Sequence, residues 1–212
     1  MISLLTLFFT SFVVAFSGAM MPGPLMTATI SESAIRGPWV GPKMIAGHAL
    51  LEILLLITLF FGLEPIFKNE WFFVIVSLAG GGIMIWMATG MFRSLPELEI
   101  KAGSSTSKRN NLYLTGILMS LANPYWIIWW ATIGLGYVMI SKAHGVTGVV
   151  FFFLGHISGD LVWYSAISVA VGKGRRFFSK RIYQTLVGAC AVFLFGFAAW
   201  LVITGIGKVI NA

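Results

Sequence analysis

The chain has 212 residues, of which 58% are hydrophobic and only 10% are charged, and its mean hydropathy is +0.92. About a quarter of the residues in a soluble domain are charged, so this composition excludes an ordinary soluble protein. The net charge of +7 does not indicate a nucleic-acid partner, because the basic residues lie in short segments between long apolar runs. Membrane proteins carry their orientation signals in such segments. We therefore predict an integral membrane protein whose surroundings are the lipid bilayer.

A single cysteine, Cys190, lies in the last apolar run. It can form no disulfide within the chain, and the sequence has no Cys-x-x-Cys pair or cysteine cluster for a metal. A phosphate-binding loop motif is also missing from the sequence, so ATP is not the predicted energy source. Because no activated nucleophile accompanies the ionisable residues, we predict no catalytic residue, no enzymatic activity, no cofactor and no resident metal.

Runs of about 20 apolar residues are long enough to cross the hydrocarbon core as helices. In chain order they predict six transmembrane helices, at about residues 3–34, 44–63, 71–92, 112–140, 146–171 and 182–207. Between them, segments 35–43 and 173–181 contain turn residues or several basic charges and are expected to be loops. The predicted fold class is an all-α integral membrane protein.

Two of these helices are expected to be broken. Pro22-Gly23-Pro24 interrupts the first and Asn123-Pro124 the fourth, because proline removes a backbone hydrogen bond and clashes with the preceding turn. In a bilayer a broken helix is tolerated only where it faces protein or a polar cavity. Each new half-helix would begin with unpaired N–H groups that attract carboxylates. We therefore predict substrate binding at Pro22, Gly23, Pro24, Asn123 and Pro124.

The second and fifth predicted helices share a polar motif, Gly-His-x-x-x-acid, with His48 and Glu52 in one and His156 and Asp160 in the other. A carboxylate at the bilayer centre costs at least ~2.5 kcal/mol on insertion scales, so such groups are functional by default. A histidine one turn from an acid is also the pairing that a proton relay uses. We predict proton coupling at these four residues. The alternative is a structural role, in which each pair only satisfies itself.

The two halves of the chain repeat one order of elements: a broken helix, a helix with ionisable residues and a plain helix. Three helices per half is an odd number, so the halves would be inverted relative to each other. Inverted repeats with paired broken helices place a transporter's site near the middle of the bilayer. We predict residues 1–92 as the first three-helix repeat, 93–111 as a cytoplasmic linker and 112–212 as the second repeat. Gly155 and Gly159 are expected to mark close helix packing.

Basic residues predict the orientation of the chain. The loops after the first, third and fifth predicted helices hold 11 of the 14 lysines and arginines. By the positive-inside rule this side is cytoplasmic. The prediction is a multi-pass protein of the cytoplasmic (inner) cell membrane with both termini outside. A homo-oligomer is compatible with the pattern.

The two breaks, together with Asp160 after Gly159 in the fifth helix, resemble the lysine exporter (LysE/RhtB-type) family. Its members are small six-helix exporters of amino acids in bacteria and archaea, and the resemblance covers essentially the whole chain. It implies a secondary transporter that exports amino acids or similar small zwitterionic metabolites, coupled to protons, with Asp160 as the favoured coupling acid. One departure is Tyr125, because many members have a lysine directly after the Asn-Pro pair.

A different function remains open from the residues alone. Histidine and carboxylate together suit transition metals, so the alternative is an exporter of metal cations or other small ions. Its ligands would be His48, Glu52, His156 and Asp160.

The fourth predicted helix carries an aromatic cluster after its break, comprising Tyr125, Trp126, Trp129 and Trp130. Aromatic residues of membrane proteins gather at the bilayer interface, so we predict an interfacial belt or packing against lipid. A less favoured alternative places one of them in the cavity.

Overall fold

The computed structural model describes residues 3–62, 69–97, 111–174 and 180–210, and all regular elements in these ranges are helical. They are α1 (Leu4–Ala19), α2 (Pro24–Arg36), α3 (Val40–Phe60), α5 (Glu70–Ser94), α6 (Leu112–Leu121), α7 (Pro124–Trp129), α8 (Leu135–Lys142), α9 (Gly145–Gly174) and α10 (Lys180–Ile210). A 3-10 turn, η1 (Leu95–Glu97), follows α5, and a π-helical turn, η2 (Trp130–Gly134), joins α7 to α8.

Helix length and apolar composition fit a membrane protein. Four helices, α3, α5, α9 and the Val187–Ile210 part of α10, are long and apolar enough to cross a bilayer, and α1 with α2 would make a fifth span. The fourth predicted helix is present only as shorter pieces, of which α6 has 10 residues.

The first predicted break is confirmed. α1 begins where the Ser3 side chain accepts a hydrogen bond from the Thr6 amide, and it ends at Ala19, ahead of the prolines. Gly23 is extended, with φ −154° and ψ −173°, and Pro24 occupies the first position of α2, where its missing N–H costs nothing. The two helices meet at an angle of 81°, so the break redirects the chain.

The second predicted break is also confirmed. Asn123 ends the interruption after α6, and its side chain accepts a hydrogen bond from the Tyr125 amide at 3.2 Å. Pro124 starts α7, again at the first helical position. The π-helical turn that follows six residues later was not predicted, since no proline or glycine pair marks its start.

Several predicted loop bounds need correction. Segment 35–43 was expected to be a loop, but α2 continues to Arg36 and α3 already begins at Val40. Pro42 lies in the first turn of α3, where proline is tolerated. Of segment 173–181, the start belongs to α9 and the end to α10, while residues 175–179 lie outside the described ranges. Most of the predicted linker, residues 98–110, also lies outside them.

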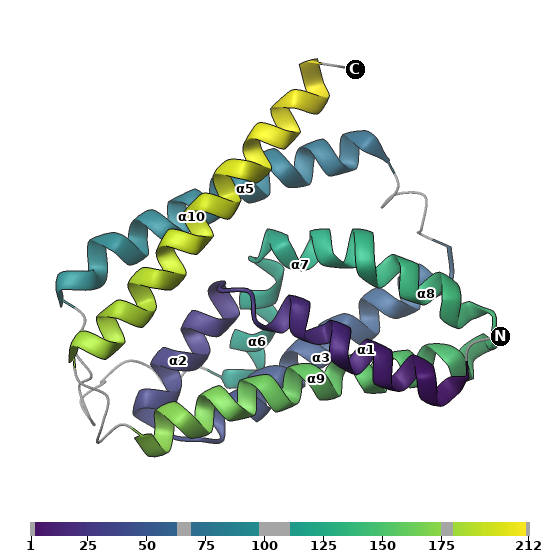
Figure 1. The fold of residues 1–212 in the computed structure, drawn as a ribbon, viewed down its shortest axis with the longest axis horizontal. Coiled ribbons are helices and arrows are strands. Elements are labelled where there is room, and N and C mark those ends of the chain that lie inside the picture. The colour runs from purple at the N-terminus through teal and green to yellow at the C-terminus, as the bar shows by residue number, and fades with distance from the viewer. Residues whose placement is uncertain (1–2, 63–68, 98–110, 175–179, 211–212) are drawn as a thin grey trace.

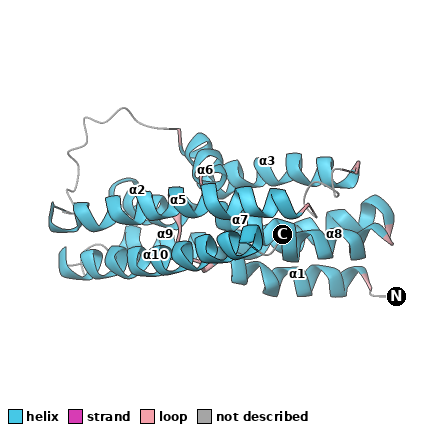
Figure 2. Ribbon diagram, turned by 90° about the horizontal axis from the view of Figure 1, so that it is seen from above, coloured by secondary structure: helices cyan, strands magenta, loops and turns pink. Residues whose placement is uncertain are grey.

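The helices form two groups, which Figure 1 shows one above the other. α5 and α10 run along each other, and in the other group α1 runs along α9 and α3 along α6. Figure 2, turned by 90°, shows the same helices lying side by side along the long axis.

Small residues allow the helices of the larger group to approach closely. Gly155 and Gly159 of α9 face the backbone of α1 at the carbonyls of Phe8 and Phe12. The predicted close packing at these glycines is confirmed. Gly47 of α3 faces a backbone carbonyl of α6 in the same way. Such contacts exclude larger side chains and let helices associate without a hydrophobic driving force.

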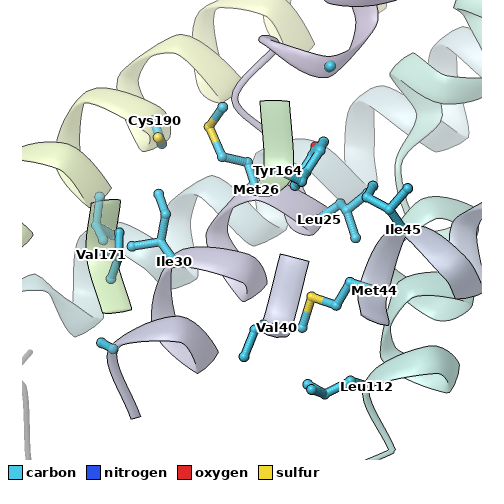
Figure 3. Packing of buried hydrophobic residues seen from close by; sticks show 13 residues of the cluster. Leu25, Met26, Ile30, Val40, Met44, Ile45, Leu112, Tyr164, Val171 and Cys190 are labelled. Atoms are coloured by element: carbon cyan, nitrogen blue, oxygen red, sulfur yellow. The ribbon is translucent and has the colours of Figure 1, made fainter. Parts of the chain in front are cut away.

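A buried apolar cluster lies where α2, α3 and α9 meet (Figure 3). Met26 and Ile30 of α2, Met44 and Ile45 of α3 and Val171 of α9 belong to it. The cluster holds the half-helix α2 against α3 and α9, the two helices that carry the predicted ionisable residues.

Candidate functional site

Four buried ionisable side chains meet between α3 and α9, each at most 6% exposed. His48 Nε2 lies 3.0 Å from Glu52 Oε1 and 3.5 Å from Asp160 Oδ2. His156 Nε2 lies 3.2 Å from the same Glu52 oxygen and 3.5 Å from the same Asp160 oxygen. Each histidine therefore contacts both acids, not only the one on its own helix. We call these four residues the His–acid cluster.

The tautomer of His48 is set by a neighbouring hydroxyl on α6. Ser120 Oγ lies 2.7 Å from His48 Nδ1, and it donates its own proton to the Gly116 carbonyl at 2.7 Å. A serine hydroxyl has one proton, so Ser120 can only accept from His48. His48 Nδ1 therefore carries a proton. No local pattern singles out Ser120, because its partner His48 lies 72 positions away in the chain.

Two indole groups of the aromatic cluster point at Glu52. Trp126 Nε1 donates to Glu52 Oε1 at 3.2 Å and Trp130 Nε1 donates to it at 3.0 Å. Counting the histidines, four N–H or imidazole groups converge on this one oxygen. The other oxygen, Oε2, has no hydrogen-bond partner among the described residues and is shielded from the surface. This single-sided arrangement leaves one carboxylate oxygen for a further donor.

The other two aromatic residues of α7 are tied to the end of α1. Trp129 Nε1 donates to Ser17 Oγ and the Tyr125 hydroxyl donates to the Ser17 carbonyl, both at 3.0 Å. Trp129 and Trp130 are only 4% and 0% exposed. The predicted interfacial belt is therefore wrong for these two residues, because each buried indole N–H needs an acceptor and finds it inside the protein. The sequence signal for an inward orientation was the i,i+4 spacing of Trp126 and Trp130, which puts both indoles on one face of the helix.

A cavity of about 40 Å³ adjoins the His–acid cluster. Its lining is polar where the cluster lies and largely aromatic elsewhere: Gly18, Ala19, Leu25, His48, Glu52, Ser120, Asn123, Tyr125, Trp126, Trp129, Trp130, His156, Asp160 and Tyr164. Leu25 and Tyr164 also belong to the apolar cluster of Figure 3.

The two helix breaks meet beside this cavity. A side chain on Gly23 would come within 3.2 Å of Asn123 Nδ2, so the amide of one break covers the glycine of the other. Of the five predicted substrate-binding residues, Asn123 lines the cavity, whereas Pro22, Gly23, Pro24 and Pro124 are not among its lining residues.

The beginning of α2 presents unpaired backbone donors. It has no side-chain cap, and its first recorded backbone hydrogen bond runs from Thr27 to the Gly23 carbonyl. The amides of Leu25 and Met26 have no partner among the described residues. The start of α7 differs, because Asn123 already accepts from Tyr125 there. Free amides at a helix start favour an anionic group.

Three members of the cluster could also converge on a cation. Ligand atoms of His48, Glu52 and Asp160 all lie within 4.8 Å of one another. In the structure these atoms contact each other and the two indoles, so an ion would have to replace those contacts.

A buried charged cluster, two broken helices and a cavity between apolar helices long enough to cross a bilayer define a membrane protein of the transporter type. The family model of the LysE type translocator matches residues 16–205, and the chain belongs to this family. Two curated relatives match along their whole length. The chain is 25% identical to the "Threonine efflux protein" of Escherichia coli (strain K12), with 95% of this chain covered. It is 19% identical to the "Putative amino acid efflux protein YcgF" of Bacillus subtilis (strain 168), with 98% covered. No solved structure matches the chain significantly.

Proposed function

We propose that this protein is a secondary transporter that exports amino acids or similar small zwitterions across the cytoplasmic membrane, coupled to protons. The observation that carries the proposal is a single cavity with two ends of opposite character. Leu25 lines it at the start of α2, where the amides of Leu25 and Met26 have no partner among the described residues, and Glu52 and Asp160 line it elsewhere. The two family relatives whose names state amino acid or threonine efflux support the same class of substrate.

At one end the substrate carboxylate would accept hydrogen bonds from the backbone amides of Leu25 and Met26, with the Asn123 side chain beside them. A helix start carries a partial positive charge, so it stabilises this anion without a lysine or arginine. At the other end the substrate ammonium would donate to Glu52 Oε2, the oxygen without a partner. The aromatic rings of the lining would contact the substrate side chain.

The contacts support the inverted repeat as the architecture. α3 and α9 occupy equivalent places, because Gly47 of α3 faces the Tyr113 carbonyl of α6 and Gly155 of α9 faces the Phe8 carbonyl of α1. α5 and α10, the last helices of the two halves, pair with each other. Six membrane crossings result if the α6–α7–α8 segment counts as one broken span, as α1–α2 does. Rocking of one group of helices against the other would then alternate access to the cavity.

Proton coupling would use the His–acid cluster. Two carboxylates and two imidazoles in mutual contact can hold a variable number of protons, and an ammonium ion bound among them changes the most favourable number. By the positive-inside rule the basic loops would face the cytoplasm, and both termini would lie outside. Export then exchanges an outgoing substrate for an incoming proton.

The test is transport in proteoliposomes loaded with individual labelled amino acids, with and without a pH gradient. Two truncated analogues of an accepted amino acid are tested as competitors: the corresponding amine, which lacks the carboxylate, and the corresponding carboxylic acid, which lacks the amine. Neither should compete with the amino acid for transport. Competition by either truncated compound at undiminished strength would refute the two-ended site.

A variant of the coupling acid separates binding from coupling. Asp160→Asn should keep exchange of labelled for unlabelled substrate and lose accumulation driven by the pH gradient. Ser168→Ala is the matched control, because Ser168 is a buried polar residue of the same helix that contacts Ser33 rather than the cluster. Wild-type accumulation by Asp160→Asn would refute coupling at this acid.

Metal-cation export is the second candidate, favoured by the approach of His48, Glu52 and Asp160 to one another. Histidine and carboxylate ligands at this spacing suit zinc. Flux of Zn²⁺ from the same proteoliposomes, with no amino acid flux, would replace the first proposal with this one.

A further inference from the structure

His48 is enclosed by groups from four elements, which together determine where its protons lie. On its own helix it faces Glu52, and across on α9 it faces Asp160, while His156 contacts the same two acids. α6 contributes the Ser120 hydroxyl. α7, continued by η2, contributes the indole N–H groups of Trp126 and Trp130 that share the Glu52 oxygen. Tyr125 and Tyr164 line the same cavity.

Ser120 leaves His48 a single tautomer when the ring is neutral. The proton on Nδ1 is held by the serine, so Nε2 of a neutral ring is a bare lone pair. That lone pair would lie 3.0 Å from Glu52 Oε1 and 3.5 Å from Asp160 Oδ2. An unprotonated nitrogen facing an unprotonated carboxylate at this distance is repulsive. The observed contact therefore requires one more proton between the two atoms.

The second histidine has no such constraint. His156 Nδ1 is buried without a hydrogen-bond partner among the described residues, and its Nε2 lies 3.2 Å from Glu52 Oε1. A neutral ring with its proton on Nε2 satisfies this arrangement, because the bare Nδ1 needs no acceptor. The two imidazoles therefore differ: His156 donates as a neutral ring, and His48 does so only when it holds an additional proton.

We propose that Ser120 is a positioning residue that fixes the tautomer of His48 and thereby places one exchangeable proton between His48 Nε2 and Glu52 Oε1, where the substrate ammonium displaces it. The inference rests on the proposed function and specifies its coupling step. When the ammonium binds at Glu52 Oε2 and also donates to His48 Nε2, the Nε2–H bond breaks and the proton leaves to water. His48 becomes neutral, and the charge of the cluster together with the bound ammonium stays the same. One cation replaces another, which makes the exchange obligatory.

The first measurement is the ¹⁵N NMR spectrum of the histidine rings in the full-length, detergent-solubilised protein. The chain has three histidines, so the His48 signals are assigned by their loss in His48→Gln. In the substrate-free wild type, His48 Nδ1 should be protonated at every pH tested, and Nε2 should carry the additional proton that the Glu52 contact requires. In Ser120→Ala the neutral ring should change tautomer and protonate Nε2. A bare Nδ1 in the wild type, or an unchanged tautomer in Ser120→Ala, overturns the inference.

The second measurement is proton release on substrate binding, followed with a pH-indicator dye in weakly buffered solution. An amino acid that the wild type transports should release about one proton per molecule bound. Ser120→Ala should release less than half as much, because its neutral ring already donates to Glu52. The alkaline limb of its export profile should also move to lower pH by about one unit, the loss of one hydrogen bond to a charged group.

Two further variants separate positioning from folding. Ser120→Thr keeps the hydroxyl and should restore proton release, and Ser168→Ala removes a buried hydroxyl elsewhere and should leave it unchanged. Equal loss in Ser168→Ala and Ser120→Ala would overturn the inference. If Ser120→Ala does not fold, the wild-type tautomer and the threonine variant still decide it. Failure of the wild type to bind any amino acid would instead refute the proposed function, and the NMR result would stand by itself.

Discussion

Replacing Glu52 by alanine should destabilise the protein strongly, because this side chain accepts hydrogen bonds from the α7–η2 segment and lies within hydrogen-bond distance of His156 on α9. The indole donors of Trp126 and Trp130 lose their partner, and each unsatisfied buried donor costs about 1–3 kcal/mol. The two histidines can turn to Asp160, which lies 3.5 Å from both. Removing the carboxylate also removes its desolvation cost, which offsets part of the loss.

The net cost should be about 3 kcal/mol, the usual loss when one partner of a buried ion pair is removed. For a chain of this size that corresponds to a fall in Tm of about 6–12 °C. Glu52→Gln keeps an amide oxygen that can accept two N–H groups, so it should lower Tm by only about 2–4 °C. Thermal unfolding in detergent, followed by far-ultraviolet circular dichroism, measures both.

A double-mutant cycle identifies the cause. In a Trp126→Phe, Trp130→Phe background the indole donors are absent, so Glu52→Ala should cost at least 1 kcal/mol less than in the wild type. Ser77→Ala is the control: its buried hydroxyl has no partner among the described residues, and Tm should stay within about 2 °C. An equal fall in Tm in both backgrounds, or no fall in either, would show that the indoles do not depend on Glu52.

Two further predictions concern packing and orientation. Gly155→Ala should separate α9 from α1 and lower Tm, because the new methyl group meets the Phe8 carbonyl. Gly136→Ala is the control: its methyl group lies in open space and should raise helix stability by up to about 1 kcal/mol. Similar Tm values for the two variants would contradict close packing of α9 on α1. Alkaline phosphatase fused after Ala212 should be active in cells, since the positive-inside rule predicts that end outside. An inactive C-terminal fusion alongside active fusions in the basic loops would reverse the predicted orientation.

Local sequence patterns predicted the breaks and the helical class well. Proline acts on its own backbone and on the turn before it, so Pro24 and Pro124 mark helix starts whatever surrounds them. Length and hydropathy likewise identify long apolar helices without knowledge of their neighbours. The start of α3 was placed too late because Pro42 reads as a loop residue, although the first helical turn accepts it.

The residues of the His–acid cluster and the contacts within each helix were predicted, but the contacts between the two helices were not. Spacing on one helix shows that His48 can reach Glu52, whereas the contact between His156 and Glu52 joins residues 104 positions apart. The roles of Trp130 and Ser120 depend on the same tertiary packing. A tryptophan at a membrane interface and a buried tryptophan with a hydrogen-bonded N–H look alike in a single sequence.

The π-helical turn η2 has a consequence for comparing this chain with its relatives. A π turn accommodates one residue more than an α turn, so it is the form that a single inserted residue takes inside a helix. Deleting one residue between Trp130 and Leu135 would convert this turn to an α turn and leave α7 and α8 facing as they do now. Leu135 and Val138 would stay in the core they share with Trp130. Where a relative has an uninterrupted helix here, the alignment gap belongs within η2, and residues of α8 then correspond one place out of step with those of α7.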